Sequence, residues 1–153
     1  VKGIGVYAGM KAVNVPGATG LYDTNYEGKA EHALKALENS DMVFVHVEAP
    51  DEAGHSRDYE LKVKTIEDLD KRLVGRLLDG LKEDCAIAIL PDHPTPIKIG
   101  THTRDPVPFA ICSPAIEADG VKLFDEESAG KGGFGLIEGE AFMLRFLGKS
   151  AAT

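Results

Sequence analysis

Apolar and polar positions along the chain follow two different periods, which predicts both strands and helices. Four apolar runs are typical of strands: residues 3–8, 42–48, 85–90 and 107–112. The near-continuous runs at 42–48 and 85–90 favour burial on both faces, as in a parallel sheet. Between these two runs, apolar residues recur every three or four positions from about Asp58 to Leu81, which predicts a long helix. Crossovers of this kind are almost always right-handed, so we expect the two strands to be parallel neighbours.

Two shorter helices and four loops complete the predicted elements. The stretch T-N-Y-E from Thr24 to Glu27 is a capping-box pattern, and the helix after it is expected to stop near Asn39. A last helix is predicted at about 138–147. Loops are predicted at 14–23, 50–57, 94–106 and 114–135, where Gly and Pro gather.

Carboxylates and imidazoles follow the two strands that flank the long helix. The five side chains are Asp51, His55, Asp92, His93 and His102. Parallel strands end at one edge of a sheet, so we expect Asp51 and Asp92 to lie close in space although they are far apart in sequence. Carboxylate with imidazole is a ligand mixture for zinc, manganese or iron, and no thiolate joins it. The sequence therefore predicts a metal site at this edge. If His102 returns to this edge, the strand at 107–112 starts there and should run antiparallel to 85–90.

Several polar residues near this edge have more than one interpretation. The D-x-x-x-H spacing of Asp51 and His55 suits either one helical turn or a tight loop at Gly54. His32 is interpreted as solvated, and His46 as a core histidine or as a residue that orients a ligand. Three nearby cations either meet a substrate phosphate or are solvated: Arg57, Lys98 and Arg104.

Composition narrows the classes of partner and the compartment. A chain of 153 residues is predicted to form a single domain spanning 1–153, and its formal net charge of -8 argues against nucleic acid as a partner. It has no apolar run of about 18 residues that could span a membrane. Cys85 and Cys112 are predicted to be buried thiols of a cytoplasmic protein, with a disulfide as the alternative. Val1 opens directly into an apolar run, so we expect a piece of a longer protein. The oligomeric state stays open.

Three motifs together resemble a known family. H-V-E-A-P-D-E-A-G-H, L-P-D-H-P-T-P and T-H-T-R-D-P-V-P-F are similar to motifs of the cofactor-independent phosphoglycerate mutases, and the resemblance is closest to the archaeal type. It covers nearly the whole chain and extends to the wider alkaline-phosphatase-like superfamily. The resemblance implies an α/β fold in which a three-layer, mostly parallel sheet carries helices on both faces, with the core present in part.

The same resemblance implies a site with two metals, manganese or zinc. Asp51, His55 and His102 would hold one ion, and Asp92 and His93 the other. The parent protein is expected to interconvert 3- and 2-phosphoglycerate through a phosphoserine, with a phosphatase or another phosphomutase as the alternative. The family's nucleophilic serine and its inserted substrate domain have no counterpart in this chain. The chain alone is therefore expected to bind one metal or none and to be catalytically incomplete, a folded metal-binding module.

Overall fold

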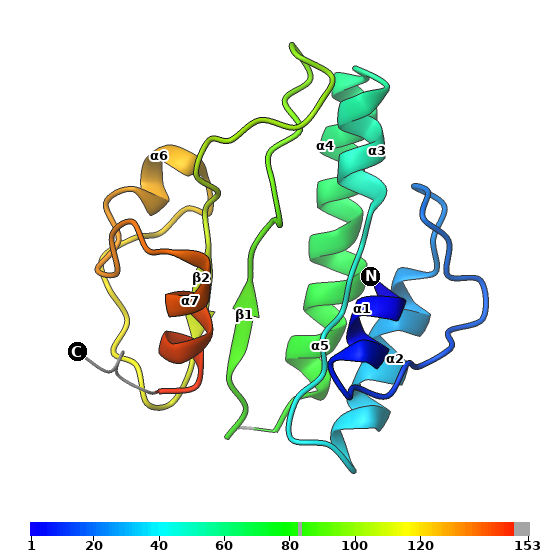
Figure 1. Cartoon of the computed structure of the whole chain (residues 1–153), viewed down its shortest axis with the longest axis vertical. Helices are drawn as coiled ribbons and strands as arrows, with labels where there is room; N and C mark the ends of the chain where they lie inside the picture. The colour runs from blue at the N-terminus through cyan, green and yellow to red at the C-terminus, as the bar shows by residue number, and fades with distance from the viewer. Residues whose placement is uncertain (83, 149–153) are drawn as a thin grey trace. The chain divides into compact units, whose positions relative to one another are not determined.

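The computed structural model describes residues 1–82 and 84–148, which form two compact units. The first unit contains Val1–Leu81 and Thr95–Thr101, and the second contains Lys82–Pro94 and His102–Thr153. In chain order the elements are α1 (Lys2–Tyr7), α2 (Tyr26–Leu37), α3 (Ala49–His55), α4 (Tyr59–Asp68), η1 (Leu69–Val74), α5 (Gly75–Gly80), β1 (Ile87–Ile89), β2 (Ala110–Cys112), α6 (Glu126–Ala129) and α7 (Gly139–Phe146) (Figure 1).

The predicted long helix is confirmed as α4, η1 and α5, which follow one another without a break (Figure 1). The Asp58 side chain caps its start by accepting a hydrogen bond from the Leu61 amide at 2.9 Å. The middle piece, η1, is a π-helix, and the α-helical pattern resumes at Gly75. The apolar period therefore predicted the extent of this helix but not its wider central turns.

The predicted helix after Thr24 is confirmed as α2, although its cap is one residue later than expected. Asn25 is the N-cap and accepts a hydrogen bond from the Gly28 amide at 2.8 Å. Thr24 instead accepts from the Thr19 amide at 3.0 Å. The apolar face of α2 joins a buried cluster of Tyr26, Ala30, Ala49 and Leu73, against which Val45, Val47, Leu69 and Leu77 pack. This cluster is the core of the first unit.

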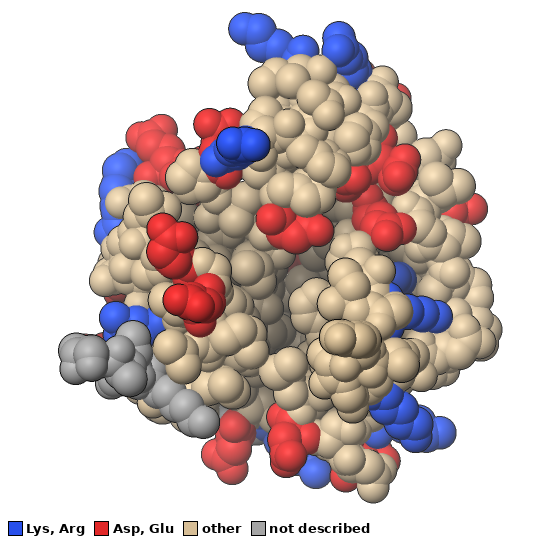
Figure 2. Space-filling view, viewed as in Figure 1, with Lys and Arg blue, Asp and Glu red and all other residues tan. Residues whose placement is uncertain are grey.

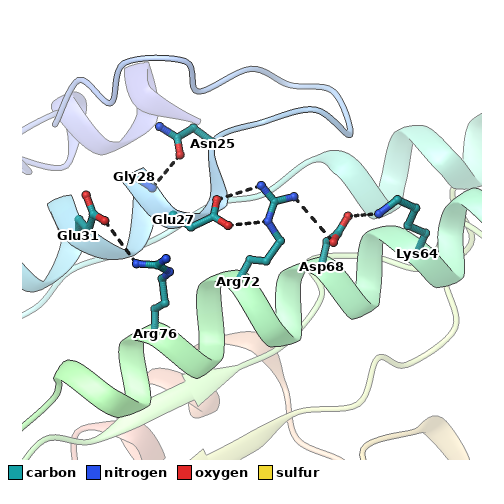
Figure 3. Close-up of polar contacts among 8 residues, drawn as sticks. All are labelled: Asn25, Glu27, Gly28, Glu31, Lys64, Asp68, Arg72 and Arg76. Carbon is teal, nitrogen blue, oxygen red and sulfur yellow. Dashed lines mark hydrogen bonds and ion pairs between the residues drawn. The ribbon is translucent and has the colours of Figure 1, made fainter.

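A row of ion pairs joins α2 to η1 and α5 beside this core (Figure 3). Arg72 donates two hydrogen bonds to the Glu27 carboxylate, at 2.6 and 2.9 Å, and its guanidinium carbon lies 5.0 Å from the centre of the Tyr26 ring. These hydrogen bonds are the main reason that the pKa of Glu27 is lowered. Asp68 and Lys64 extend the row by a further ion pair of 2.7 Å. Arg72 of η1 therefore contacts α2 twice, through the Glu27 carboxylate and through the Tyr26 ring.

The predicted strand at 42–48 is wrong for the part of the chain that the structure describes. The segment is extended and alternates as a strand does: Val45 and Val47 pack on the core, whereas Met42 and Phe44 are 38% and 60% exposed. No described residue forms a ladder with it, so the expected parallel pairing with 85–90 is absent from the described sheet. A strand needs a hydrogen-bonded neighbour, and apolar periodicity does not supply one.

The predicted strand at 3–8 is also wrong, because these residues form the short helix α1. Periodicity alone does not tell a strand from a helix in an apolar run this short.

The segment 42–48 is held to α2 by a side chain: Lys29 Nζ donates a hydrogen bond to the carbonyl of His46 at 2.8 Å. Burial lowers the pKa of this lysine.

In the second unit, β1 and β2 form an antiparallel pair, which confirms the direction predicted for 85–90 and 107–112. Ile87 faces Cys112 and Ile89 faces Ala110. These two strands are the whole sheet of the described residues, and their remaining elements are helices, so the described residues do not form the predicted three-layer, mostly parallel sheet. The last predicted helix is confirmed as α7.

Aromatic side chains pack together in the second unit. Phe109 lies beside β2 and packs against Phe134 and Phe142, with ring centres 5.8 and 5.5 Å away. Both cysteines are free thiols; Cys85 is half-buried and Cys112 is exposed, so the prediction of burial is wrong for Cys112. Cys112 belongs to β2, whose residues alternate between exposed and half-buried.

The predicted loops at 14–23 and 94–106 are confirmed, and 114–135 contains the short helix α6. Within the 114–135 segment, the Asp119 carboxylate accepts hydrogen bonds from the amides of Val121 and Gly133, at 3.0 and 2.9 Å. These bonds lower the pKa of Asp119. The carboxylate therefore ties the glycine-rich stretch to the start of the loop.

None of the described helices combines the length and the apolar character that crossing a bilayer requires. On the face shown in Figure 2, Lys and Arg side chains lie in small separate groups, interspersed with acidic ones. On this face the basic groups do not join into a continuous stripe.

Candidate metal centre

In the first unit, α3 places Asp51 and His55 on the same helix face. Pro50 lies in the first turn, where its missing N–H costs no hydrogen bond, and the helix runs to His55. Residues four apart on a helix are neighbours, and His55 Nε2 lies 3.3 Å from Asp51 Oδ2. The predicted loop at 50–57 is therefore wrong, whereas the helical-turn interpretation of the D-x-x-x-H spacing is confirmed.

The segment Thr95–Thr101 lies against α3 and fixes Asp51. Thr95 is 4% exposed, and its hydroxyl donates to the Asp51 carboxylate. Its carbonyl accepts from Lys62 Nζ at 2.7 Å. Gly54 permits this approach, since a Cβ there would lie 2.5 Å from the Thr95 carbonyl oxygen. The carboxylate is thus oriented from two sides, by its own helix and by the buried hydroxyl.

His55 is oriented by the same segment. Its Nδ1 lies 3.1 Å from the carbonyl oxygen of Gly100, which can only accept, so Nδ1 is the donor. In the neutral imidazole the lone pair is then on Nε2, the atom nearest Asp51. A lone pair and a carboxylate oxygen at 3.3 Å attract each other only with a cation or a proton between them. The pair therefore has the donor chemistry of a divalent metal site.

In the second unit, Asp92, His93 and His102 lie together in the segments between β1 and β2. The rings of His93 and His102 stack with centres 3.7 Å apart. His93 Nε2 lies 3.6 Å from Asp92 Oδ2, and the His93 amide donates to the other carboxylate oxygen at 3.1 Å. The Thr103 amide donates to the carbonyl of Pro94 at 3.1 Å, which closes the turn beside the rings.

The five predicted ligands thus divide between the two units. The first unit brings Asp51 to His55, and the second brings Asp92 to His93 and His102. All five offer carboxylate oxygen or imidazole nitrogen, which fits manganese or zinc. Their convergence on two ions, with His102 beside the α3 pair, stays a prediction.

The other predicted residues have more ordinary places. Lys98 and Arg104 are exposed. His46 has a side chain that is 26% exposed and lies 3.9 Å from Glu48, so it is outside the buried core. His32 is half-buried, and its Nδ1 lies 2.8 Å from the Gly28 carbonyl of its own helix. None of these contacts adds a ligand to the site.

Sequence reasoning missed three residues that contribute to this region: Lys62, Thr95 and Gly100. The setting of Thr95 between Pro94 and Pro96 is a usable signal, because two prolines fix the backbone around one hydroxyl. The contacts of Lys62 and Gly100 join residues 33 and 45 positions apart, which no local pattern reports.

The fold and donor set described above are those of a metal-dependent enzyme class. The chain belongs to the metalloenzyme superfamily, whose family model matches residues 1–148. It is 56% identical over 142 residues to the 2,3-bisphosphoglycerate-independent phosphoglycerate mutase of Methanosarcina acetivorans, covering 90% of this chain and 36% of the relative. A probable enzyme of the same name from Geobacter sulfurreducens is 50% identical over 150 residues, covering 96% of this chain and 38% of the relative.

A solved structure is also similar to this chain. The structure of the PH0037 protein from Pyrococcus horikoshii matches with a TM-score of 0.91 at 36% identity, covering 99% of this chain and 47% of that one. The resemblance to the archaeal mutases is therefore confirmed. The chain spans about a third of the length of the curated relatives it matches.

Proposed function

We propose that this chain is the part of a phosphoglycerate mutase that supplies most of its metal ligands. The observation that carries the proposal is the α3 pair, in which His55 Nε2 lies 3.3 Å from the Asp51 carboxylate and His55 Nδ1 lies 3.1 Å from the Gly100 carbonyl. Relatives that are 50–56% identical and carry the mutase name support the choice of reaction. The parent protein is proposed to act in the cytoplasm and to interconvert 3- and 2-phosphoglycerate.

In this proposal, Asp51, His55 and His102 hold one divalent ion, and Asp92 and His93 contribute to a second. Asp51, His93 and His102 each offer one ligand atom of the required kind. A bound manganese or zinc pair would neutralise phosphate charge and make an oxygen nucleophile more reactive. The residues of this chain hold and orient: Thr95 fixes the Asp51 carboxylate, and Gly100 fixes the ring of His55.

A chimera tests the proposal directly. The matching third of the Methanosarcina acetivorans relative is replaced by this chain, and conversion of 3- to 2-phosphoglycerate is measured with added Mn²⁺ or Zn²⁺. We expect turnover that chelation removes and metal restores. Release of inorganic phosphate without isomerisation would indicate a phosphatase instead. A folded chimera that neither isomerises nor hydrolyses the substrate would overturn the proposal.

The isolated chain of 153 residues provides the second arm. We expect it to bind metal weakly and unequally, because Asp92 and His93 supply only two ligands to their ion. We also expect no conversion of phosphoglycerate, since the nucleophile of the proposed reaction is assigned to another part of the parent. Titration calorimetry with each metal measures the first expectation. Enzymatic turnover by the purified chain contradicts the second.

A further inference from the structure

Arg57 has a backbone conformation that its side chain disfavours. Among the described residues other than glycine, it is the one with a positive φ, at 59°. The Arg57 amide donates to the Gly54 carbonyl and the Asp58 amide to the Ala53 carbonyl, at 3.1 and 3.3 Å. This is the Schellman ending of α3, and Arg57 stands where glycine is usual. A non-glycine residue there costs about 1–2 kcal/mol, which the contacts of its side chain must offset.

The Arg57 side chain reaches the segment that orients His55. Its Nη2 donates to the carbonyl of Ile99 at 2.8 Å. It also fills the space beside Gly100, where a Cβ would lie 3.1 Å from Arg57 Cγ and 3.2 Å from its Cζ. Gly100 itself has a φ of 72°, and its amide and that of Ile99 donate to the carbonyl of Pro96, at 2.8 and 3.0 Å. The guanidinium therefore packs on a tight turn whose last carbonyl accepts from His55.

We propose that Arg57 is a positioning residue for His55, acting through the turn at Ile99 and Gly100. The guanidinium fixes the Gly100 carbonyl, that carbonyl holds Nδ1–H, and Nε2 is thereby presented as the donor atom. Partners of this kind set the orientation and the tautomer of metal-ligating histidines. In this scheme Arg57 acts through the turn and is not itself a metal ligand. The proposal rests on the proposed metal site for its consequence, but its structural effect does not need bound metal.

The Arg57→Gly variant separates positioning from folding in the chain of 153 residues. Glycine accepts the left-handed conformation without strain, so the α3 ending is kept and the unfolding midpoint should stay level or rise. The loss of the guanidinium should loosen the turn. In the metal-free chain we expect faster amide exchange at Ile99 and Gly100, and ¹⁵N shifts of His55 that report a mixture of the two neutral tautomers.

Metal affinity supplies a further readout, measured by calorimetry with Mn²⁺ and Zn²⁺. Removing a partner that orients a ligand typically lowers affinity about 10–100-fold, and we expect Arg57→Gly to fall in that range. The matched control is Lys98→Ala, which removes one exposed positive charge from the same segment and should change none of these readouts. Arg57→Asn is the second variant, because asparagine also tolerates the left-handed region and is too short to reach Ile99.

The outcomes separate this proposal from the proposed function. Unchanged amide exchange and His55 tautomer in both Arg57 variants, equal to those of Lys98→Ala, overturn the positioning role. Loosening of the turn in both Arg57 variants supports the positioning role whether or not the isolated chain binds metal, and the chimera tests the metal site separately. An unfolding midpoint that drops equally in Arg57→Gly and Arg57→Asn, without a change of tautomer, makes Arg57 a structural residue and also overturns the proposal.

Discussion

The two units hold their candidate ligands by different means. In the first, Asp51 and His55 lie one turn apart on a helix and are oriented by Thr95 and Gly100. In the second, the ligands lie outside helices and strands, and a stacked pair of rings and one turn bring them together. The buried hydrophobic side chains of the described residues all belong to the first unit: Tyr26, Ala30, Ala33, Ala49, Ala53 and Leu73. Packing thus pre-orients one half of the ligand set more firmly than the other.

Asp51→Ala should have the largest effect on metal binding by the first unit. It removes a proposed ligand from the better-ordered half, so metal affinity should fall by more than about 100-fold, the upper range for partners that only orient ligands. Activity of the chimera should be lost with it. Calorimetry and the mutase assay measure both, and circular dichroism should show the fold retained, because the side chain is outside the core.

Thr95→Val is the matched control for Asp51→Ala. It keeps the carboxylate and removes only the hydroxyl that orients it. We expect a smaller loss of metal-binding free energy, about 1 kcal/mol, which is typical of one hydrogen bond. If the chimera that carries Asp51→Ala keeps wild-type turnover at saturating metal, Asp51 is not a ligand.

Gly54→Ala should break the packing that distinguishes the first unit. The new Cβ would lie 2.5 Å from the Thr95 carbonyl oxygen and 2.9 Å from Lys62 Nζ, so backbone must shift. Overpacking costs about 1–3 kcal/mol, which outweighs the gain of about 1 kcal/mol from alanine in a helix. We expect a net loss of up to about 2 kcal/mol in urea unfolding. Gly139→Ala in α7, where a Cβ meets nothing within 4 Å, should be neutral or stabilising.

Acid should weaken the contact between α2 and η1. The folded-state pKa of Glu27 is lowered, chiefly by its hydrogen bonds to Arg72. The stabilisation is therefore present above the unfolded-state pKa and is lost as the pH falls through the lower folded-state pKa. Glu27→Gln should cost about 0.5–1 kcal/mol at neutral pH, as expected for a largely surface pair, and should make the acid decline shallower. Glu31→Gln, whose partner Arg76 is 3.5 Å away and well exposed, should change little in the same pH series.

Asp119→Asn should have the smallest effect, confined to the second unit. Asparagine keeps one acceptor oxygen, so one of the two amide contacts, to Val121 or to Gly133, is weakened. We expect faster amide exchange at one of these residues with no shift of the unfolding midpoint. Glu117→Gln, an exposed charge change in the same loop, is the comparison. If the unfolding midpoint falls for Asp119→Asn and not for Glu117→Gln, this loop contributes more to stability than we expect.

Sequence reasoning succeeded where one pattern repeats and failed where contacts are distant. The long helix was predictable because apolar residues from Val63 to Leu81 keep one period over many turns. The helix α3 was missed because Pro50 and Gly54 are loop signals, although proline fits a first turn and glycine a close approach. For 42–48 the apolar run was visible and was interpreted as a strand buried on both faces, but the presence of a neighbouring strand is not a local property. The hold of Arg57 on Ile99 spans 42 positions and has no local signature.

The path of the chain also constrains the order of events during folding. Pairing of β1 with β2 closes a loop, and that loop contains Thr95–Thr101, which belongs to the other unit. The entropy cost of closing such a loop falls when its middle is already anchored, so docking of this segment on α3 favours formation of the strand pair. The path of the chain therefore links the two units during folding. Weakening the docking of Thr95–Thr101 on α3 should slow the pairing of β1 with β2 in refolding.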